Sequence, residues 1–174
     1  RALGPVVAAG IPVVGMEPSC TAALRHDLPR LVPTPTAGRV AAGVRTVAEV
    51  LTTAIDDGRW SAPDLTGTEV IAQPHCHHHA VMSWAADEAL LTRTGATVTR
   101  LGGCCGLAGN FGVELGHYEV SVKVAQQQLL PAIDAASADA VVLADGFSCQ
   151  TQIADLSERT GVHLVELLAR GTYA

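Results

Sequence analysis

Aromatic residues and positive charges are scarce in this chain. Only 3% of its 174 residues are aromatic, and Lys123 is its single lysine. The formal net charge is −6, which makes nucleic acid and anionic membranes poor candidates as partners. No apolar run is long enough to span a bilayer, so we expect no transmembrane segment. We find no signal peptide, and because the chain starts at Arg1 we expect it to be a fragment of a longer protein.

Cysteine is also infrequent, with five residues in the chain. Five are too few for a secreted disulfide framework, and the adjacent Cys104 and Cys105 are poorly placed to pair with each other. This usage favours a reducing cytoplasm in which the thiols serve metal or redox chemistry. What the chain has in abundance is apolar residues, 48% of the total, which predicts a packed core rather than disorder.

The apolar segments alternate between strand-like and helix-like patterns. Short β-branched runs predict buried strands at 11–16, 69–72, 97–101, 140–144 and 163–165. Helical patterns lie between them, at 21–28, 40–56, 80–94, 118–136 and 150–160, with a break or kink at Pro131. This alternation predicts an α/β fold with parallel strands and Rossmann-like βα units, arranged in one or two lobes.

The cysteines share one position in this pattern, because each follows a predicted strand and precedes a predicted helix. The carboxyl ends of parallel strands lie at one edge of a sheet, so the thiols should converge there, close to helix N-termini that lower thiol pKa. A single such cysteine would be better explained as core filling. All five together predict a metal or redox site, formed by Cys20, Cys76, Cys104, Cys105 and Cys149.

Four histidines surround Cys76 in the sequence. His75 and His77 flank the cysteine directly, and each could hydrogen-bond a cluster sulfur or act as a ligand. His78 and His79 cannot face the same point in so tight a loop. We expect these two to be surface or packing residues at the start of a helix.

Glycines bracket the cysteine pair, at Gly102, Gly103 and Gly106. Glycine allows close backbone approach, so a bulky inorganic cluster could touch the chain here and accept hydrogen bonds from its amides. A phosphate-binding loop is the competing interpretation. It is disfavoured because the segment has neither the Gly-Lys-Ser/Thr ending of a P-loop nor the spacing of a dinucleotide fingerprint.

Together these motifs resemble a known family, the cysteine-rich CCG domain. The segments that carry the resemblance are Glu17–Cys20, His75–His77, Gly103–Gly112 and Gly146–Ile153. This domain occurs in heterodisulfide reductase and in the iron-sulfur subunits of glycolate oxidase and anaerobic glycerol-3-phosphate dehydrogenase. The likeness is greatest to the C-terminal part of large proteins that join an FAD-linked D-2-hydroxyacid dehydrogenase to iron-sulfur domains.

The resemblance implies that Cys76, Cys104, Cys105 and Cys149 hold an iron-sulfur cluster of 4Fe-4S type. The family pattern ends in Cys-x-x-Cys, and here Gln152 stands where the last cysteine would be. Four thiolates suffice for a cubane cluster, whereas a larger assembly needs a fifth, which Cys20 would supply. Zinc in place of the cluster is the alternative cofactor.

The resemblance also implies a function and a domain organisation. Residues 1–60 would end a preceding lobe, and 61–174 would form the main CCG module of a cytoplasmic oxidoreductase. FAD would be bound on another domain, and this segment would pass electrons from that flavin domain to a downstream acceptor without catalytic residues of its own. Two alternatives remain open from the residues themselves, a structural zinc domain and a thiol-disulfide redox module.

Overall fold

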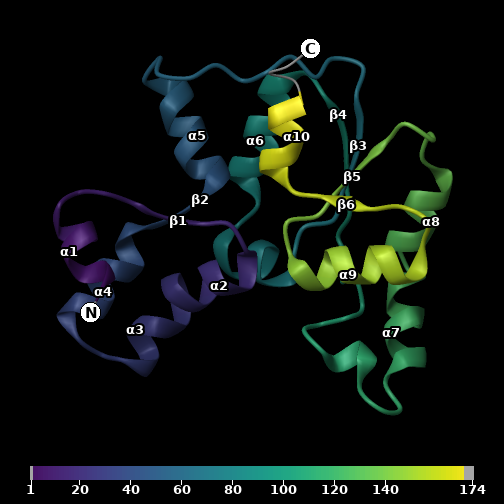
Figure 1. The fold of residues 1–174 in the computed structure, drawn as a ribbon, viewed down its shortest axis with the longest axis horizontal. Helices are drawn as coiled ribbons and strands as arrows, with labels where there is room; N and C mark the ends of the chain where they lie inside the picture. Colours follow the sequence, from purple (N-terminus) through teal and green to yellow (C-terminus); the bar gives the residue numbers. More distant parts are fainter. Residues whose placement is uncertain (1, 171–174) are drawn as a thin grey trace.

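The chain forms two parallel sheets of unequal size, seen side by side in Figure 1 of the computed structural model, which describes residues 2–170. The larger sheet has the strand order β4-β3-β5-β6, and each neighbouring pair is parallel. The smaller sheet pairs β1 with β2, also in parallel. The expected α/β fold with parallel strands is therefore confirmed. The strands are β1 (Val13–Gly15), β2 (Val44–Thr46), β3 (Glu69–Ala72), β4 (Thr97–Arg100), β5 (Val141–Leu143) and β6 (Gly161–Val162).

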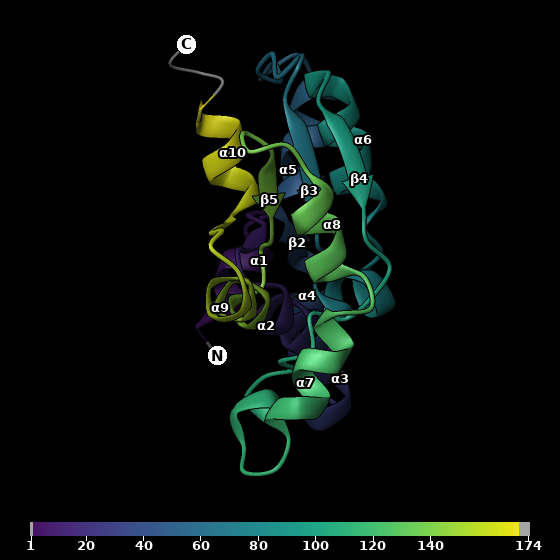
Figure 2. The same ribbon diagram turned by 90° about the vertical axis from the view of Figure 1, so that its right-hand side faces the viewer.

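Helices cover both faces of the larger sheet, because successive residues of a strand point to opposite sides. Val70 and Ala72 of β3 pack into one core together with α5 (Val47–Asp56), α6 (Ala85–Thr94) and α10 (Leu164–Arg170). Ile71 packs into the other core together with α7 (Tyr118–Ala125), α8 (Leu129–Ala135) and α9 (Phe147–Leu156). After a quarter turn, α7 and the loop before it project beyond the carboxyl ends of the strands (Figure 2).

The smaller sheet belongs to a small lobe, which we define as residues 2–46. Four helices surround its two strands: α1 (Leu3–Ala8), α2 (Pro18–Ala22), α3 (Leu28–Leu31) and α4 (Pro35–Gly43). A π-helical turn, Ala23–Asp27, joins α2 to α3. The small lobe meets the rest of the chain where α2 packs against a second π-helical turn, His78–Met82, which follows β3. The carboxyl end of β1 is thereby brought next to that of β3.

Several predicted elements differ from the observed ones. The helix predicted at 40–56 is wrong at its centre, because Val44–Thr46 pairs with β1 and separates α4 from α5. The helix predicted at 80–94 is interrupted at Ser83, where φ is +68°. The long helix at 118–136 divides into α7 and α8 ahead of Pro131, which lies in the first turn of α8, where proline is tolerated. The last strand is β6 rather than 163–165.

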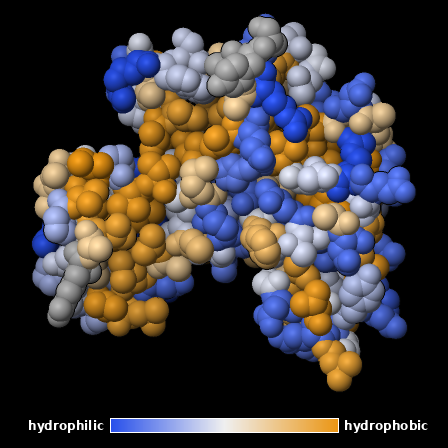
Figure 3. All heavy atoms as spheres, viewed as in Figure 1, coloured by the Kyte–Doolittle hydropathy of each residue, from blue (hydrophilic) through white to orange (hydrophobic). Residues whose placement is uncertain are grey.

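Apolar side chains are exposed over much of the small lobe, as the orange atoms of Figure 3 show. The large hydrophobic residues exposed on and beside it are Val6, Ile11, Val14, Met16, Leu31 and Val32. Within residues 2–170, no helix combines the length and the apolar character that crossing a membrane requires. The clustering of these side chains marks the small lobe as a surface suited to contact with other protein.

Candidate functional site

Four thiols meet at the carboxyl edge of the larger sheet. Cys76 follows β3, Cys104 and Cys105 follow β4, and Cys149 lies in the first turn of α9 after β5. The Cys104 side chain hydrogen-bonds with those of both Cys76 and Cys105, and Cys105 also hydrogen-bonds with Cys149. The four sulfurs therefore form a continuous string that draws on three separate strand ends. Cys105 and Cys149 are buried, whereas Cys76 is exposed.

The pKa of Cys104 differs in direction from those of Cys76 and Cys105. Hydrogen bonds from Cys105, Cys76 and the Gly106 amide hold the pKa of Cys104 well below its usual range. Because Cys76 and Cys105 donate to Cys104, the pKa of each is raised, and the burial of Cys105 raises its pKa further. A second or third thiolate in this string thus requires added positive charge. A bound metal ion supplies such charge and releases the thiol protons, so the donor set fits a thiolate-bound metal or iron-sulfur centre.

His75 connects the loop after β3 to the start of α9. Its Nδ1 accepts a hydrogen bond from the His77 backbone amide at 3.2 Å, which leaves Nε2 protonated and able to donate to the Ser148 hydroxyl at 3.3 Å. Burial lowers the pKa of His75, which favours the neutral ring. Gly146 makes room for this ring, since a Cβ there would lie 2.3 Å from its Cδ2 atom. His77 lies edge-on to His75, with ring centroids 5.4 Å apart.

The glycines around the cysteine pair have different roles. The amides of Gly102 and Gly103 both donate to Gln128 Oε1, at 2.9 and 3.0 Å, so the expectation that they point at sulfur is wrong for these two. The Gly106 amide does point at sulfur, 3.4 Å from Cys104 Sγ. Gly106 also has φ of +99°, and a Cβ on it would lie 2.2 Å from the Ser121 carbonyl oxygen. The backbone at Gly106 therefore requires glycine.

Cys20 is not part of the hydrogen-bonded string of thiols, but it lines a cavity of about 640 Å³ together with Cys76. Its thiol hydrogen-bonds the Glu17 carboxylate, which raises the pKa of Cys20. Ser19 and the Cys20 amide also donate to Glu17, which begins α2. The cavity is lined by residues of both lobes: Glu17, Ser19, Cys20, His75, Cys76, His77, Ala108, Gly109, Asn110, Phe147 and Ser148.

Gln152 occupies a buried position one helical turn after Cys149. Residues three apart lie on the same face of a helix, so α9 directs both side chains toward the core. The Gln152 amide donates to the Ser121 hydroxyl at 2.9 Å. At the position where the resemblance to the CCG domain predicts a cysteine, Gln152 thus forms a hydrogen bond that links α9 to α7.

Sequence reasoning missed a second group of polar side chains, two of them buried, at the junction of the two lobes. It consists of His78, Asp87 and Asp145, whose ligand atoms all lie within 4.8 Å of one another. His78 is buried as a packing residue, one of the two roles expected for it, and it is not on the surface. Burial opposes its charged form, but Asp87 and the neighbouring carboxylates outweigh burial and raise the pKa of His78. Burial raises the pKa of Asp145.

The signal for this group was present in the sequence but weak. Asp145 lies two residues after β5, at the same sheet edge as the cysteines, and Asp87 lies in the first turn of α6. An acidic residue in a first helical turn is usually explained by the helix dipole, so Asp87 gave no reason to expect burial.

Comparison with known proteins supports an oxidoreductase relationship over part of a much larger protein. A D-2-hydroxyglutarate dehydrogenase of Pseudomonas putida is 26% identical over 162 residues, which cover 91% of this chain. The same match covers 15% of the dehydrogenase, so the chain spans about a seventh of that relative's length. No protein-family description matches the chain, and no solved structure matches it. The CCG assignment therefore stays a prediction, and the chain is distantly similar to one segment of a hydroxyacid dehydrogenase.

Proposed function

We propose that this chain is an electron-transfer domain of an FAD-dependent 2-hydroxyacid dehydrogenase, with an iron-sulfur cluster held by Cys76, Cys104, Cys105 and Cys149. The observation that carries the proposal is the convergence of these four thiols from three strand ends. Iron-sulfur clusters in proteins are held by cysteine thiolates, commonly four of them. The D-2-hydroxyglutarate dehydrogenase relative supplies the class of reaction.

The bound cluster would supply reversible one-electron chemistry, and the residues around it would tune that chemistry. The Gly106 amide donates to Cys104 Sγ, and hydrogen bonds to ligand sulfurs shift a cluster's reduction potential. Burial lowers the pKa of His75, and its hydrogen bond with Ser148 positions the loop that carries Cys76 against α9. Burial of Cys105 and Cys149 keeps that side of the site away from water.

The flavin and the electron acceptor would be bound by other domains or by partner proteins. The relative is far longer than this chain, so a flavin-binding domain would correspond to sequence outside the matched segment. The exposed apolar residues of the small lobe, among them Val14, Met16 and Leu31, fit contact with such a domain. Phe147 is 72% exposed and lines the same cavity as Cys76, where a partner could approach the cluster.

A structural zinc site is the second candidate, because four cysteine thiolates also suit tetrahedral Zn²⁺. The stabilised Cys104 thiolate next to free thiols also fits a thiol-disulfide module, with Cys104 as the nucleophile. The three candidates differ in metal content and colour. A cluster contains iron and inorganic sulfide and is brown, whereas the zinc and dithiol forms are colourless.

The test is anaerobic purification followed by iron, sulfide and zinc analysis and by EPR of the reduced protein. We expect about four irons per chain for a cubane and loss of most iron in Cys104→Ser. Phe147→Ala is the matched control, because Phe147 lines the same cavity but offers no ligand atom, and its iron content should equal wild type. Stoichiometric zinc without iron would instead establish the zinc domain, and a metal-free chain that cycles between dithiol and disulfide would establish the third candidate.

A further inference from the structure

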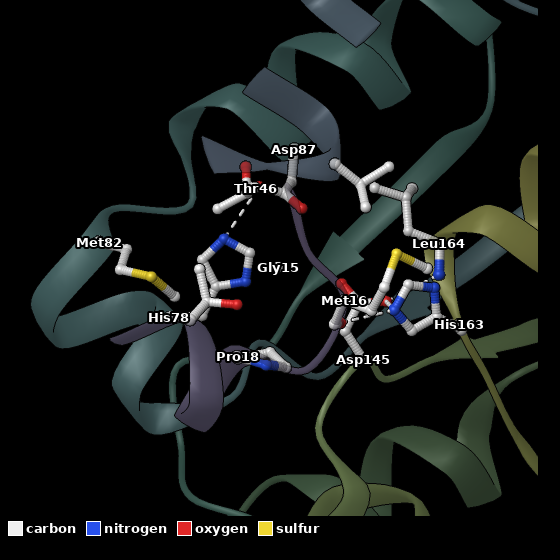
Figure 4. Close-up of a pocket in the computed structure, with 12 residues that line it drawn as sticks. Gly15, Met16, Pro18, Thr46, His78, Met82, Asp87, Asp145, His163 and Leu164 are labelled. Atoms are coloured by element: carbon white, nitrogen blue, oxygen red, sulfur yellow. Dashed lines mark hydrogen bonds and ion pairs between the residues drawn. The ribbon is translucent and has the colours of Figure 1, made fainter. Parts of the chain in front are cut away.

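The buried group at the lobe junction surrounds a small cavity (Figure 4). His78 and Asp87 approach it from the π-helical turn and α6, while Asp145 and His163 approach from the ends of β5 and β6. Met16 and Thr46 of the small lobe complete the wall. The cavity volume is about 10 Å³, which is room for one atom-sized occupant such as a metal ion or a water molecule.

Two atoms that face this cavity have no hydrogen-bond partner. His78 Nε2 and Asp87 Oδ2 are both buried and unpartnered, although they lie 3.1 Å apart. The two groups attract each other electrostatically, but their orientation does not form a hydrogen bond. The side chains of His78 and Asp87 are only 4% and 3% exposed, so bulk water cannot satisfy either atom. An unpartnered buried carboxylate oxygen is strongly unfavourable, and an ion between the two atoms would satisfy both.

The carboxylate of Asp145 lies close to these two atoms. The ligand atoms of His78, Asp87 and Asp145 lie within 4.8 Å of one another. Asp145 Oδ1 accepts from the Leu164 amide at 2.7 Å, and His163 Nε2 lies 3.7 Å from the same oxygen. His163 Nε2 also lies 2.9 Å from the Met16 carbonyl oxygen, so this nitrogen is already engaged and His163 is not one of the three ligands.

We propose that His78, Asp87 and Asp145 form a second metal site, which binds one divalent transition-metal ion at the junction of the two lobes. One imidazole and two carboxylates suit ions such as Mn²⁺, Fe²⁺ and Zn²⁺, and a divalent charge balances two buried carboxylates. The site is separate from the thiolates in ligand chemistry and in position, and it does not depend on whether those thiolates hold a cluster. Its role is structural, because it links the turn after β3, helix α6 and the end of β5.

Binding of Mn²⁺ tests this proposal, because Mn²⁺ prefers oxygen and imidazole ligands and has little affinity for thiolates. The purified full chain is titrated under reducing conditions, and bound Mn²⁺ is counted from the loss of the free-ion EPR signal. We expect one Mn²⁺ per chain, with affinity at least tenfold weaker in His78→Gln and in Asp145→Asn. His26→Gln is the matched control, because His26 pairs with Asp27 on the surface at 3.1 Å and should leave binding unchanged.

Two further measurements, thermal unfolding with Mn²⁺ and Mn²⁺ binding by Cys104→Ser, test the site even if the ligand variants fold poorly. Mn²⁺ should raise the thermal unfolding midpoint of wild type in a concentration-dependent way, as any ligand of the folded state does. Cys104→Ser should bind Mn²⁺ as wild type does, even though it loses its iron. The proposal is overturned if wild type neither binds Mn²⁺ nor is stabilised by it, which would mean that the cavity holds only water. Loss of Mn²⁺ binding in Cys104→Ser would likewise overturn it, by assigning the ion to the thiols.

Discussion

Among single residues, the site depends on how neighbouring polar groups share protons and hydrogen bonds. The pKa of Cys104 is lowered, which favours its thiolate, chiefly because two thiols and one amide donate hydrogen bonds to it. Gly106 contributes to this arrangement in two ways: its amide donates to Cys104 Sγ, and its positive φ and its close approach to Ser121 leave no room for a side chain. The environment of Cys104 thus depends in part on one glycine.

Gly106→Ala should be more destabilising than the same change at Gly109. Both glycines have positive φ, at +99° and +75°, so alanine is strained at either position by about 1 kcal/mol. Only at Gly106 would the new Cβ also meet a backbone atom, the Ser121 carbonyl oxygen at 2.2 Å, which we expect to add about 1–3 kcal/mol. Urea unfolding of the two variants measures the difference, and equal free energies of unfolding would contradict this interpretation.

Cys20→Ser tests whether the fifth thiol belongs to the site. Cys20 and Cys76 line the same cavity, so a cluster bound at Cys76 would lie within reach of Cys20. A serine hydroxyl can keep the hydrogen bond to Glu17, so the fold should be preserved. We expect reconstituted Cys20→Ser to contain as much iron as wild type, because four thiolates suffice for the proposed cubane. Iron content as low as in Cys149→Ser would show instead that Cys20 is a fifth ligand of a larger assembly.

Among the helices and strands, short parallel strands place the functional loops, and capping interactions define where the helices start. Thr46 and Glu49 form a reciprocal capping box at the start of α5, directly after β2. The transition from strand to helix within a few residues is therefore stabilised locally. On the other side of the site, the π-helical turn after β3 buries His78 and ends at Ser83, ahead of α6.

Ser83 holds an unfavourable backbone conformation between these two elements. Its φ and ψ are +68° and +141°, in a region that is populated almost entirely by glycine, and its hydroxyl accepts from the Ala85 amide at 3.3 Å. Ser83→Ala and Ser83→Gly both remove the hydroxyl, but only glycine relieves the strain. We expect the glycine variant to be more stable than the alanine variant by about 1–3 kcal/mol in chemical unfolding. Equal stabilities would show that Ser83 is unstrained.

Across the molecule as a whole, the two lobes meet at both candidate sites. The large cavity is lined by small-lobe residues such as Cys20 and by large-lobe residues such as Cys76. The small cavity likewise has Thr46 on one side and Asp145 on the other. Relative movement of the lobes would therefore alter both sites together.

Acid stability of the whole chain should depend in part on Glu69, which joins the start of β3 to the connection after α8. Hydrogen bonds from the Ser137 side chain and from the Ser137 amide, the latter at 3.2 Å, hold the pKa of this carboxyl below its ordinary value of 4.5. A carboxyl with a lowered pKa in the folded state stabilises the fold above its unfolded pKa, and this contribution is lost as pH falls through the folded value.

Thermal unfolding between about pH 6 and pH 3, the range in which a glutamate with a lowered pKa takes up its proton, tests this dependence on Glu69. Wild type should lose more stability over this range than Glu69→Gln, because the variant has no carboxyl to protonate. Glu119→Gln is the control, since Glu119 is exposed on α7, and it should follow wild type. Parallel loss of stability in all three proteins would show that Glu69 makes no contribution.

Local sequence patterns are sufficient to predict the α/β class and the strands that end next to Cys76, Cys104 and Cys149. These features follow from the periodicity of apolar residues and from the common direction of parallel strands, both of which can be recognised in a single sequence. The occurrence of cysteines after strands also indicated which edge of the sheet carries the chemistry.

Contacts between distant segments set the features that the sequence patterns did not predict. Val44–Thr46 continues a helical pattern and becomes a strand because β1 lies beside it. The amides of Gly102 and Gly103 donate to Gln128, which precedes α8, and Gln152 donates to Ser121 of α7. His78 and Asp87 are polar residues whose burial next to Asp145 results from how the lobes pack. Such pairings join residues far apart in the chain, so local sequence patterns carry no record of them.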